Sequence, residues 1–453
     1  MVFISLGRVT SLNKYSLLFF IVFIMVRCSD DHSGSENNSS QGVLDTVLIL
    51  GGSLNDVAKS VIATTDGGFA ILGYTQSLDG DIVGKINESF DFWLLKLNSN
   101  LGIEWDKTYG GTEDDRGGDL IQTSDGGYVI AGYTGSSDGD VKNNNGNRDF
   151  WIARTDRTGN LLWENSFGFS GADEAFSLIE TNDNHYIVSG VLDVTASEGQ
   201  GNNGRQSARH AGGDFWTVKI SLDGKLIWSR FYGGSFTDSP RDILENAENE
   251  LLSVGTSDSY DVDITKNKGT YDFWVVKSNM DGDLIWEKSF GGGEIDEASG
   301  ITATKDGAYL IVGDTRSDEQ DVSLNMGAAD LWIIKISDNG ELLWDKSIGG
   351  SNFDVAKSIC PSASNGYIIA GSSRSSDGDV EKNQGQNDAW IVKIGDKADL
   401  VWELTVGGSE IDFAYDAVQL IDGSIIAVGE TSSSDGDIPQ NKGFTDLLII
   451  KVK

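Results

Sequence analysis

The chain has 453 residues, with 57 glycines, 3 prolines and a formal charge of −36 at pH 7. This acidity excludes nucleic acid as a partner, because its phosphates are held by clustered Lys and Arg side chains. The two cysteines, Cys28 and Cys360, are too few for a disulfide framework or a zinc cluster.

The first predicted element is an export signal at residues 1–28. Arg8 and Lys14 precede the apolar run from Tyr15 to Val26, which is too short to span a bilayer but typical of the core of a secretory signal. Residues 29–42 are polar and lack periodicity, so we expect a flexible tether there. The chain is therefore predicted to leave the cytoplasm.

The signal ends at a cysteine, Cys28, which Ser29-Asp30-Asp31 follows. This arrangement resembles the lipoproteins of the Bacteroidetes lineage. The resemblance implies lipidation of Cys28 and display at the surface of the outer membrane, with the lipid as the protein's one membrane anchor. Arg27 stands where such signals usually carry Gly, Ala or Ser, so an ordinary secretory signal and a secreted protein are the alternative.

Seven repeats fill residues 43–453. A Gly-Gly pair or its equivalent recurs at spacings of 58, 59 or 65 residues, beginning at Gly51, Gly110, Gly168, Gly233, Gly291, Gly349 and Gly407. In the second repeat, four strand-like runs cover residues 116–123, 128–134, 149–155 and 160–167. The second and third of these runs are apolar on both faces, as in central strands, and Asp125-Gly126 is typical of a tight hairpin turn.

Four strands in each of seven repeats predict an all-β protein, a seven-bladed β-propeller with four-stranded blades. An open solenoid is the competing architecture. The seventh repeat supplies only three strands before Lys453, while the run from Asp45 to Leu50 stands where a fourth strand belongs. We therefore predict that this N-terminal strand joins the C-terminal three strands and closes the ring.

The 12 tryptophans support the same fold, because all of them fall at two repeat positions. Large rings at fixed positions are predicted to fill the gaps between neighbouring blades. Leu448 and Thr46 stand at the two missing positions, both in the closing blade. The two sets are Trp93, Trp151, Trp216, Trp274, Trp332 and Trp390 on the third strand, and Trp105, Trp163, Trp228, Trp286, Trp344 and Trp402 on the fourth.

The motifs of the repeat also carry a family resemblance. Tyr109-Gly110-Gly111 with Asp115, Gly132-Tyr133-Thr134 with a serine-rich turn, Asp149 before an aromatic strand, and a Gly-Asn-Leu-Leu-Trp strand follow one another. This order resembles the SBBP repeat, a seven-bladed β-propeller unit of bacterial extracellular proteins, over residues 43–453. The resemblance implies a surface or secreted location and no shared reaction.

Two acidic signatures recur. An aspartate five residues after the first glycine of each pair is interpreted as structural, since its carboxylate can accept the amides of the glycine turn. These residues are Asp56, Asp115, Asp173, Asp238, Asp296, Asp354 and Asp412.

The second signature, Asp-x-Asp, lies in the long loop between the second and third strands. Its oxygens suit structural Ca²⁺, while ordinary Asx turns without metal are the alternative. The residues are Asp79 and Asp81, Asp138 and Asp140, Asp261 and Asp263, Asp377 and Asp379, Asp435 and Asp437, with Glu319 and Asp321 in the fifth repeat.

The third repeat departs from the pattern. Its loop from Val191 to Gly213 is longer, lacks Asp-x-Asp and carries Arg205, Arg209 and His210, which makes it a candidate ligand-binding segment, with a floppy polar loop as the alternative. The three histidines show no spacing for a zinc site or a serine triad.

The leading hypothesis is a noncatalytic binding platform for a glycan, a peptide or an envelope protein. A propeller enzyme acting on extracellular polysaccharide and a structural spacer are the alternatives.

Overall fold

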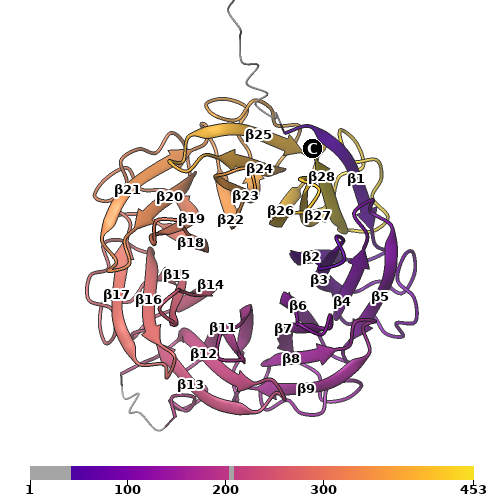
Figure 1. The fold of residues 1–453 in the computed structure, drawn as a ribbon, viewed down its shortest axis with the longest axis horizontal. Coiled ribbons are helices and arrows are strands. Elements are labelled where there is room, and N and C mark those ends of the chain that lie inside the picture. The colour runs from indigo at the N-terminus through magenta and orange to yellow at the C-terminus, as the bar shows by residue number, and fades with distance from the viewer. Residues whose placement is uncertain (1–41, 204–208) are drawn as a thin grey trace, which may run out of the picture. The chain divides into compact units, whose positions relative to one another are not determined.

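The computed structural model of the protein describes residues 42–203 and 209–453. These residues form 28 strands in seven four-stranded antiparallel sheets, which surround a central opening (Figure 1). The predicted all-β fold and seven-bladed β-propeller are therefore confirmed. Within the same residues, no helix has the length and apolar character needed to cross a membrane.

Each blade runs from an innermost strand beside the channel to an outermost strand, and its strands are named in that order. Blade 1 is β2 (Asp56–Ala63), β3 (Phe69–Thr75), β4 (Asp91–Leu97) and β5 (Ile103–Tyr109); blade 2 is β6 (Asp115–Gln122), β7 (Tyr128–Thr134), β8 (Asp149–Thr155) and β9 (Leu161–Phe167); blade 3 is β10 (Glu174–Glu180), β11 (His185–Asp193), β12 (Gly213–Ser221) and β13 (Leu226–Tyr232). Blade 4 is β14 (Asp238–Glu245), β15 (Glu250–Ser257), β16 (Asp272–Asn279) and β17 (Leu284–Phe290); blade 5 is β18 (Asp296–Ala303), β19 (Tyr309–Thr315), β20 (Asp330–Ile336) and β21 (Leu342–Ile348). Blade 6 is β22 (Asp354–Pro361), β23 (Tyr367–Ser373), β24 (Asp388–Ile394) and β25 (Leu400–Val406); blade 7 is β26 (Asp412–Gln419), β27 (Ile425–Thr431), β28 (Asp446–Val452) and β1 (Leu44–Leu50).

The ring closes through blade 7, which holds both ends of the propeller. Strand β1 pairs antiparallel with β28, from Leu44 opposite Val452 to Leu50 opposite Leu447. The amide of Lys453 donates to the carbonyl of Val43 at 2.9 Å, and the amide of Val43 donates back at 3.1 Å. In Figure 1 the indigo β1 lies beside the yellow β28. The predicted closure by the N-terminal strand is confirmed.

The core lies between neighbouring blades, where the apolar faces of the central strands meet. Phe92 of blade 1 contacts Trp151 of blade 2 edge-on, with 4.7 Å between ring centroids. Equivalent ring contacts recur in the pairs Phe215–Trp274 and Phe273–Trp332, which are edge-on, and Phe150–Trp216, which is tilted. Tryptophans of the third strand are thus buried between blades, as predicted.

Tryptophans of the fourth strand also make a contact that the sequence did not predict. Trp105 is half-buried and covers the hairpin turn of the next blade at Gly159. A Cβ at Gly159, where φ is +78°, would lie 2.9 Å from the Trp105 ring, so both the backbone angle and the close approach require glycine. The outer tryptophans therefore cover each blade's neighbour instead of filling the core alone.

The aspartates that follow the glycine pairs are structural, as predicted. Asp56 accepts the amide of Gly52 at 2.7 Å and the hydroxyl of Ser77 at 2.8 Å through Oδ2, while the Thr75 hydroxyl donates to Oδ1. In the other six blades the equivalent amide bond measures 2.7 or 2.8 Å. Each carboxylate thereby joins the glycine turn to the innermost strand and to the strand beside it.

Candidate functional site

A β-bulge interrupts every innermost strand at the same position. In β2 the pairing with β3 skips Lys59, because the register shifts between Ala58 and Ser60. A bulged residue is left out of the ladder, and its side chain can be turned toward a site. We call the seven skipped residues the bulge ring: Lys59, Gly118, Phe176, Arg241, Ser299, Lys357 and Tyr415.

All seven members of the bulge ring line one cavity in the central channel. The cavity has a volume of about 370 Å³, and Glu297 and Ala298 complete its lining. The residue before each bulge is small in six blades and Pro240 in the seventh, while the bulge ring itself holds six residue types. The seven blades are alike, but the side chains that they place around this cavity differ. The cavity is therefore the place where the protein can recognise a specific ligand.

The three cations of the bulge ring come from blades 1, 4 and 6. Lys59 lies over the ring of Tyr415, with Nζ 3.7 Å from its centroid, and the Arg241 guanidinium lies 5.0 Å from the centroid of Phe176. Among the described residues, no carboxylate oxygen lies within 4.0 Å of the charged nitrogens of Lys59, Arg241 or Lys357. Aromatic contacts thus hold two of these cations without neutralising them.

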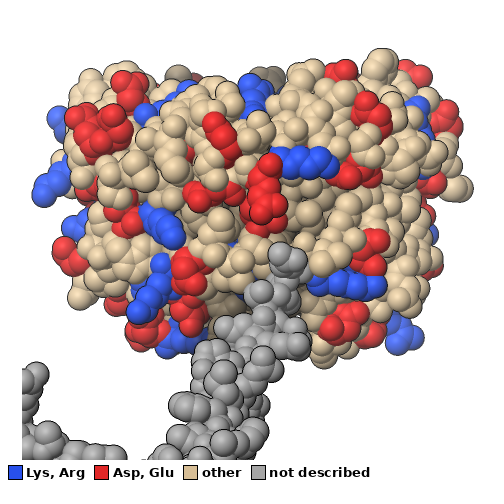
Figure 2. Space-filling view, turned by 90° about the horizontal axis from the view of Figure 1, so that it is seen from above, with Lys and Arg blue, Asp and Glu red and all other residues tan. Residues whose placement is uncertain are grey.

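Burial lowers the pKa of Lys59 to about 8; the charge of Glu430 opposes this shift, and the charges of Lys357, Arg241 and Arg116 reinforce it. A cation held beside other cations disfavours its own charged form. Such an arrangement is typical of functional sites, because it costs stability that a purely structural residue would not. The surface seen in Figure 2 differs, since acidic and basic side chains are interspersed there.

Acidic groups near the cavity are mostly engaged by other partners. Glu174 pairs with Arg148, and Glu430 accepts the hydroxyl of Tyr415. Burial raises the pKa of Asp314 to about 7, so this carboxyl is largely protonated below that pH. Glu297 is the acidic residue that lines the cavity itself.

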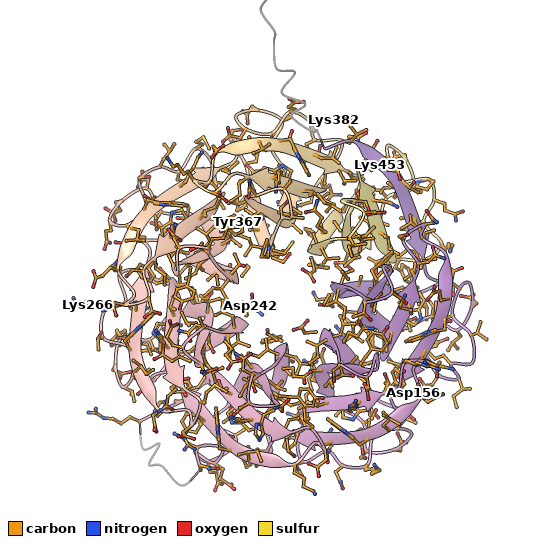
Figure 3. The ribbon with its side chains drawn as sticks, in the orientation of Figure 1. Asp156, Asp242, Lys266, Tyr367, Lys382 and Lys453 are labelled. Carbon is orange, nitrogen blue, oxygen red and sulfur yellow. The ribbon has the colours of Figure 1, made fainter. Side chains whose placement is uncertain are left out.

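Directly after the bulge ring, three aspartates join neighbouring blades. Asp119 of blade 2 accepts the Ser60 hydroxyl of blade 1 and the Leu178 amide of blade 3, both at 2.8 Å. Asp242 of blade 4 accepts the Ser177 hydroxyl at 3.1 Å and the Ile301 amide at 3.0 Å. In Figure 3, Asp242 lies at the inner rim of the ring, while Lys266 and Lys382 lie on its outer side.

Asp416 of blade 7 completes this aspartate girdle, which comprises Asp119, Asp242 and Asp416. Asp416 accepts the amide of Val61 at 2.9 Å and the hydroxyl of Ser60 at 3.3 Å, so it spans the junction of the closing blade with blade 1. Serine and aspartate alternate around the channel, and because seven is odd the alternation fails once, where Gly300 of blade 5 precedes Ser358 of blade 6. The girdle thus links neighbouring innermost strands by hydrogen bonds directly beside the bulge ring.

The structure places the Asp-x-Asp carboxylates on the glycine turn of their own blade. Asp79 Oδ1 accepts the amide of Ser53 at 2.7 Å, and Asp81 Oδ2 accepts the amide of Gly51 at 3.0 Å. The same pair of bonds recurs at Asp138 and Asp140, Asp261 and Asp263, and Asp377 and Asp379, with single amide bonds to Asp321 and Asp435. Asp437 instead accepts the side-chain amide of Gln384. The loops are therefore fastened to the glycine turns by carboxylate–amide hydrogen bonds between residues 26 or 30 apart in the sequence.

Grouped metal-ligand atoms occur elsewhere. Among the described residues, the one cluster of three or more acidic, His or Cys ligand atoms is Glu248, Glu250 and Asp338. Lys277 already pairs there with Glu250 at 2.6 Å and Asp338 at 2.7 Å. A cation in an Asp-x-Asp loop would thus need backbone carbonyls to complete its coordination.

Calcium binding by the Asp-x-Asp loops stays a prediction. If these loops bind calcium, the melting temperature should fall when a chelator replaces excess Ca²⁺. An ion that binds only the folded state adds about 2.7 kcal/mol to the free energy of unfolding at one hundred times its dissociation constant. Differential scanning calorimetry in the two buffers measures this shift, with Mg²⁺ as the control cation. An unchanged melting temperature would leave the amide hydrogen bonds as the motif's whole function.

Of the candidate ligand-binding residues of the third repeat, the structure describes Arg209 and His210, and ligand binding by this loop stays a prediction. Arg205 lies outside the described residues, and Arg209 is exposed. The His210 side chain is only 7% exposed, with Nδ1 2.6 Å from Asp214 Oδ2 and the ring edge-on to Phe231. Burial alone lowers the pKa of His210, but the hydrogen bond and charge of Asp214, with Asp263 and Asp238, raise it above its ordinary value.

Other predicted features fall outside the described residues. These are the signal at residues 1–28, the lipidation site Cys28 and residues 29–41 of the tether. Lipidation and the choice between anchored and secreted forms therefore stay predictions.

Comparisons with known proteins find only distant similarity to solved structures. No protein-family model and no curated protein matches the chain. Among solved structures, it is similar to a protein of unknown function from Dyadobacter fermentans, with 12% identity over 91% of this chain and 99% of that one, at a TM-score of 0.45. It is also similar to the Neurospora crassa Pan2 WD40 domain (9% identity, 89% and 95% coverage, TM-score 0.45) and to Drosophila Plexin A in complex with Semaphorin 1b (9%, 91% and 87%, 0.47).

Proposed function

We propose that the protein is an extracytoplasmic, noncatalytic binding platform whose ligand enters the central channel and contacts the bulge ring. The observation that carries this proposal is the set of unpaired cations Lys59, Arg241 and Lys357 in one cavity of an otherwise acidic chain. Neither ring geometry nor blade packing requires these side chains, since Gly118 and Ser299 occupy the same position in other blades. Binding accounts for them.

The location in the proposal rests on the sequence. The apolar run from Tyr15 to Val26 supports export, and Cys28 followed by Ser29-Asp30-Asp31 supports anchoring at the cell surface. A secreted form follows if Arg27 prevents lipidation. The resemblance of the repeats to the SBBP unit supports both locations, and a glycan, a peptide or an envelope protein are the ligands in reach there.

A channel-blocking variant tests the proposal. Panels of glycans and peptides are screened for binding to the purified protein, and each hit is repeated with Ser299→Trp, which places a large ring in the cavity. The matched control is Ser409→Trp, because Ser409 is exposed in the turn between blades 6 and 7 and its side chain is outside the cavity. We expect binding to be lost with the first variant and retained with the second, at similar melting temperatures.

Each other result has a definite meaning. Turnover of a polysaccharide would replace the binding platform with the enzyme alternative. Binding that survives Ser299→Trp would place the site away from the channel. If no member of either panel binds, the structural spacer becomes the better account.

A further inference from the structure

We infer that the ligand of the bulge ring is the end of an acidic glycan, a sugar unit or short oligosaccharide that carries at least two carboxylate or sulfate groups. This inference rests on the proposed function and deepens it. Its basis is the chemistry of the cavity, namely three separated cations, one carboxylate and a volume of small-molecule size.

Charge is the first reason. The chain has 34 Lys and Arg residues against 70 Asp and Glu residues, so nearby carboxylates are easy to find. Lys96, for example, pairs with Asp66 at 3.0 Å and Glu104 at 3.1 Å. Cations without a carboxylate oxygen within 4.0 Å remain able to attract an external anion.

The spacing of the cations is the second reason. Blades 1, 4 and 6 supply them, so Lys59, Arg241 and Lys357 face the cavity from separate sides instead of forming one patch. A single small anion would contact one or two of them. A ligand with several anionic groups around a rigid ring satisfies all three.

The remaining lining explains why a sugar fits better than a simple polyacid. Glu297 offers acceptor oxygens to hydroxyl donors, which sugars carry and polycarboxylates largely lack. Gly118 and Ser299 leave open space between the larger side chains. The volume of about 370 Å³ lies at the lower end of the range of about 300 to 1,000 Å³ for small-ligand pockets, which is enough for a terminal sugar unit.

Calorimetric titration with three probes tests the inference on the purified protein. The probes are trigalacturonate, the neutral trisaccharide maltotriose and citrate. We expect saturable binding of trigalacturonate, weaker binding of citrate and none of maltotriose. Affinity for trigalacturonate should fall as NaCl rises, since salt screens charge attraction.

Charge-removing variants locate the interaction. We expect Lys59→Gln, Arg241→Gln and Lys357→Gln each to weaken trigalacturonate binding about 10- to 100-fold, the range for loss of a charged hydrogen bond. The matched control is Lys225→Gln, because Lys225 is exposed and pairs with Asp223 outside the cavity. Loss of a cation should also raise or preserve the melting temperature, which separates lost binding from lost folding.

The pH dependence provides an independent readout. Lys59 loses its proton near pH 8 among Lys357, Arg241, Arg116 and Glu430, so wild-type affinity should fall as pH rises through 8. Lys59→Arg should remove most of that decline, because a guanidinium stays charged. Asp119 and Asp314 titrate near pH 7 and are present in both proteins. Any change of affinity that comes from these two groups should therefore be the same in the wild type and in Lys59→Arg.

The outcomes separate the two proposals. Maltotriose binding that Ser299→Trp abolishes but Lys59→Gln spares would overturn the acidic-glycan inference and keep the channel as the site. Citrate binding without trigalacturonate binding would identify a free small polyacid and overturn the inference likewise. If Ser299→Trp and Lys59→Gln both bind trigalacturonate as tightly as the wild type does, the inference and the channel site are overturned together.

Discussion

A chain that begins at residue 52 is expected to lose most of the stability of the propeller, since it lacks the closing strand β1. Ile49 and Leu50 are each 4% exposed, and the burial of each side chain contributes about 2 to 3 kcal/mol to the free energy of unfolding. The backbone bonds between β1 and β28 add about 1 kcal/mol each. Their sum is on the order of 10 kcal/mol, which matches the whole stability of an ordinary domain.

The measurement compares melting temperatures of two chains, one beginning at residue 42 and one at residue 52. The first keeps β1 and should melt like the full protein. The second should melt more than about 15 °C lower or fail to fold, and a peptide of residues 42–51 added in trans should restore part of the loss. Equal melting temperatures would show that β28 is stable as an edge strand and that ring closure contributes little.

The repeat period made the fold predictable. Strands predicted at residues 116–123 and 160–167 differ by one residue from Asp115–Gln122 and Leu161–Phe167, and the two central strands of that blade agree fully. The reason is that each feature occurs seven times, so accidental patterns do not persist. Closure was predictable because three strands at one end of the chain match one strand at the other.

The bulge ring was not predictable by the same means. Lys59 stands in the strand Asp56–Ala63, where alternation alone gives no sign of a skipped residue. Its partner Tyr415 lies in the last blade, and only the closed ring brings the two together. Comparison of the repeats position by position would have given one signal, since the residue three after each repeated aspartate takes six types in seven blades, while the residue before it is small in six of them.

His210 makes a structural contact that its loop sequence did not predict, while its role in ligand binding stays a prediction. Its place in an unusual loop suggested a ligand surface, but the side chain lies against Asp214 at the junction of blades 3 and 4. In other blades the same position supplies a main-chain amide to the equivalent aspartate, as Met326 does for Asp330. An unusual loop can thus conceal a residue that replaces a repeated structural contact.

The protein is expected to be more stable at pH 5 than at pH 8. Four of the aspartates that open third strands are fully buried, and burial raises the pKa of these four, Asp149, Asp330, Asp388 and Asp446, to about 6. The Oδ1 atom of each lacks a hydrogen-bond partner among the described residues. Across Gly349, where a Cβ would lie 2.5 Å from Asp330 Oδ1 and 3.0 Å from Asp354 Oδ2, a second carboxylate adds repulsion.

The direction of the effect follows from proton binding. In the unfolded chain these groups titrate near pH 3.8, so between that value and about 6 the folded state holds more protons. Rising pH therefore favours unfolding across this interval, and the stability that each protonated group contributes is complete below pH 3.8 and lost above about 6. For one group, the free energy of unfolding falls by on the order of 3 kcal/mol as the pH rises through this whole interval.

Denaturant midpoints at pH 5, 6.5 and 8 test this expectation. Asp330→Asn imitates the protonated carboxyl, so it should exceed the wild type at all three pH values, and by more at pH 8 than at pH 5. Asp66→Asn is the control, since hydrogen bonds from Thr64 and Gly68 and the charge of Lys96 outweigh burial and lower the pKa of Asp66 to about 2, outside the tested range. Its effect should be equal at all three pH values. A wild type that is more stable at pH 8, or an Asp330→Asn variant that is weaker there, would mean that these carboxylates are ionised and held by a bound cation.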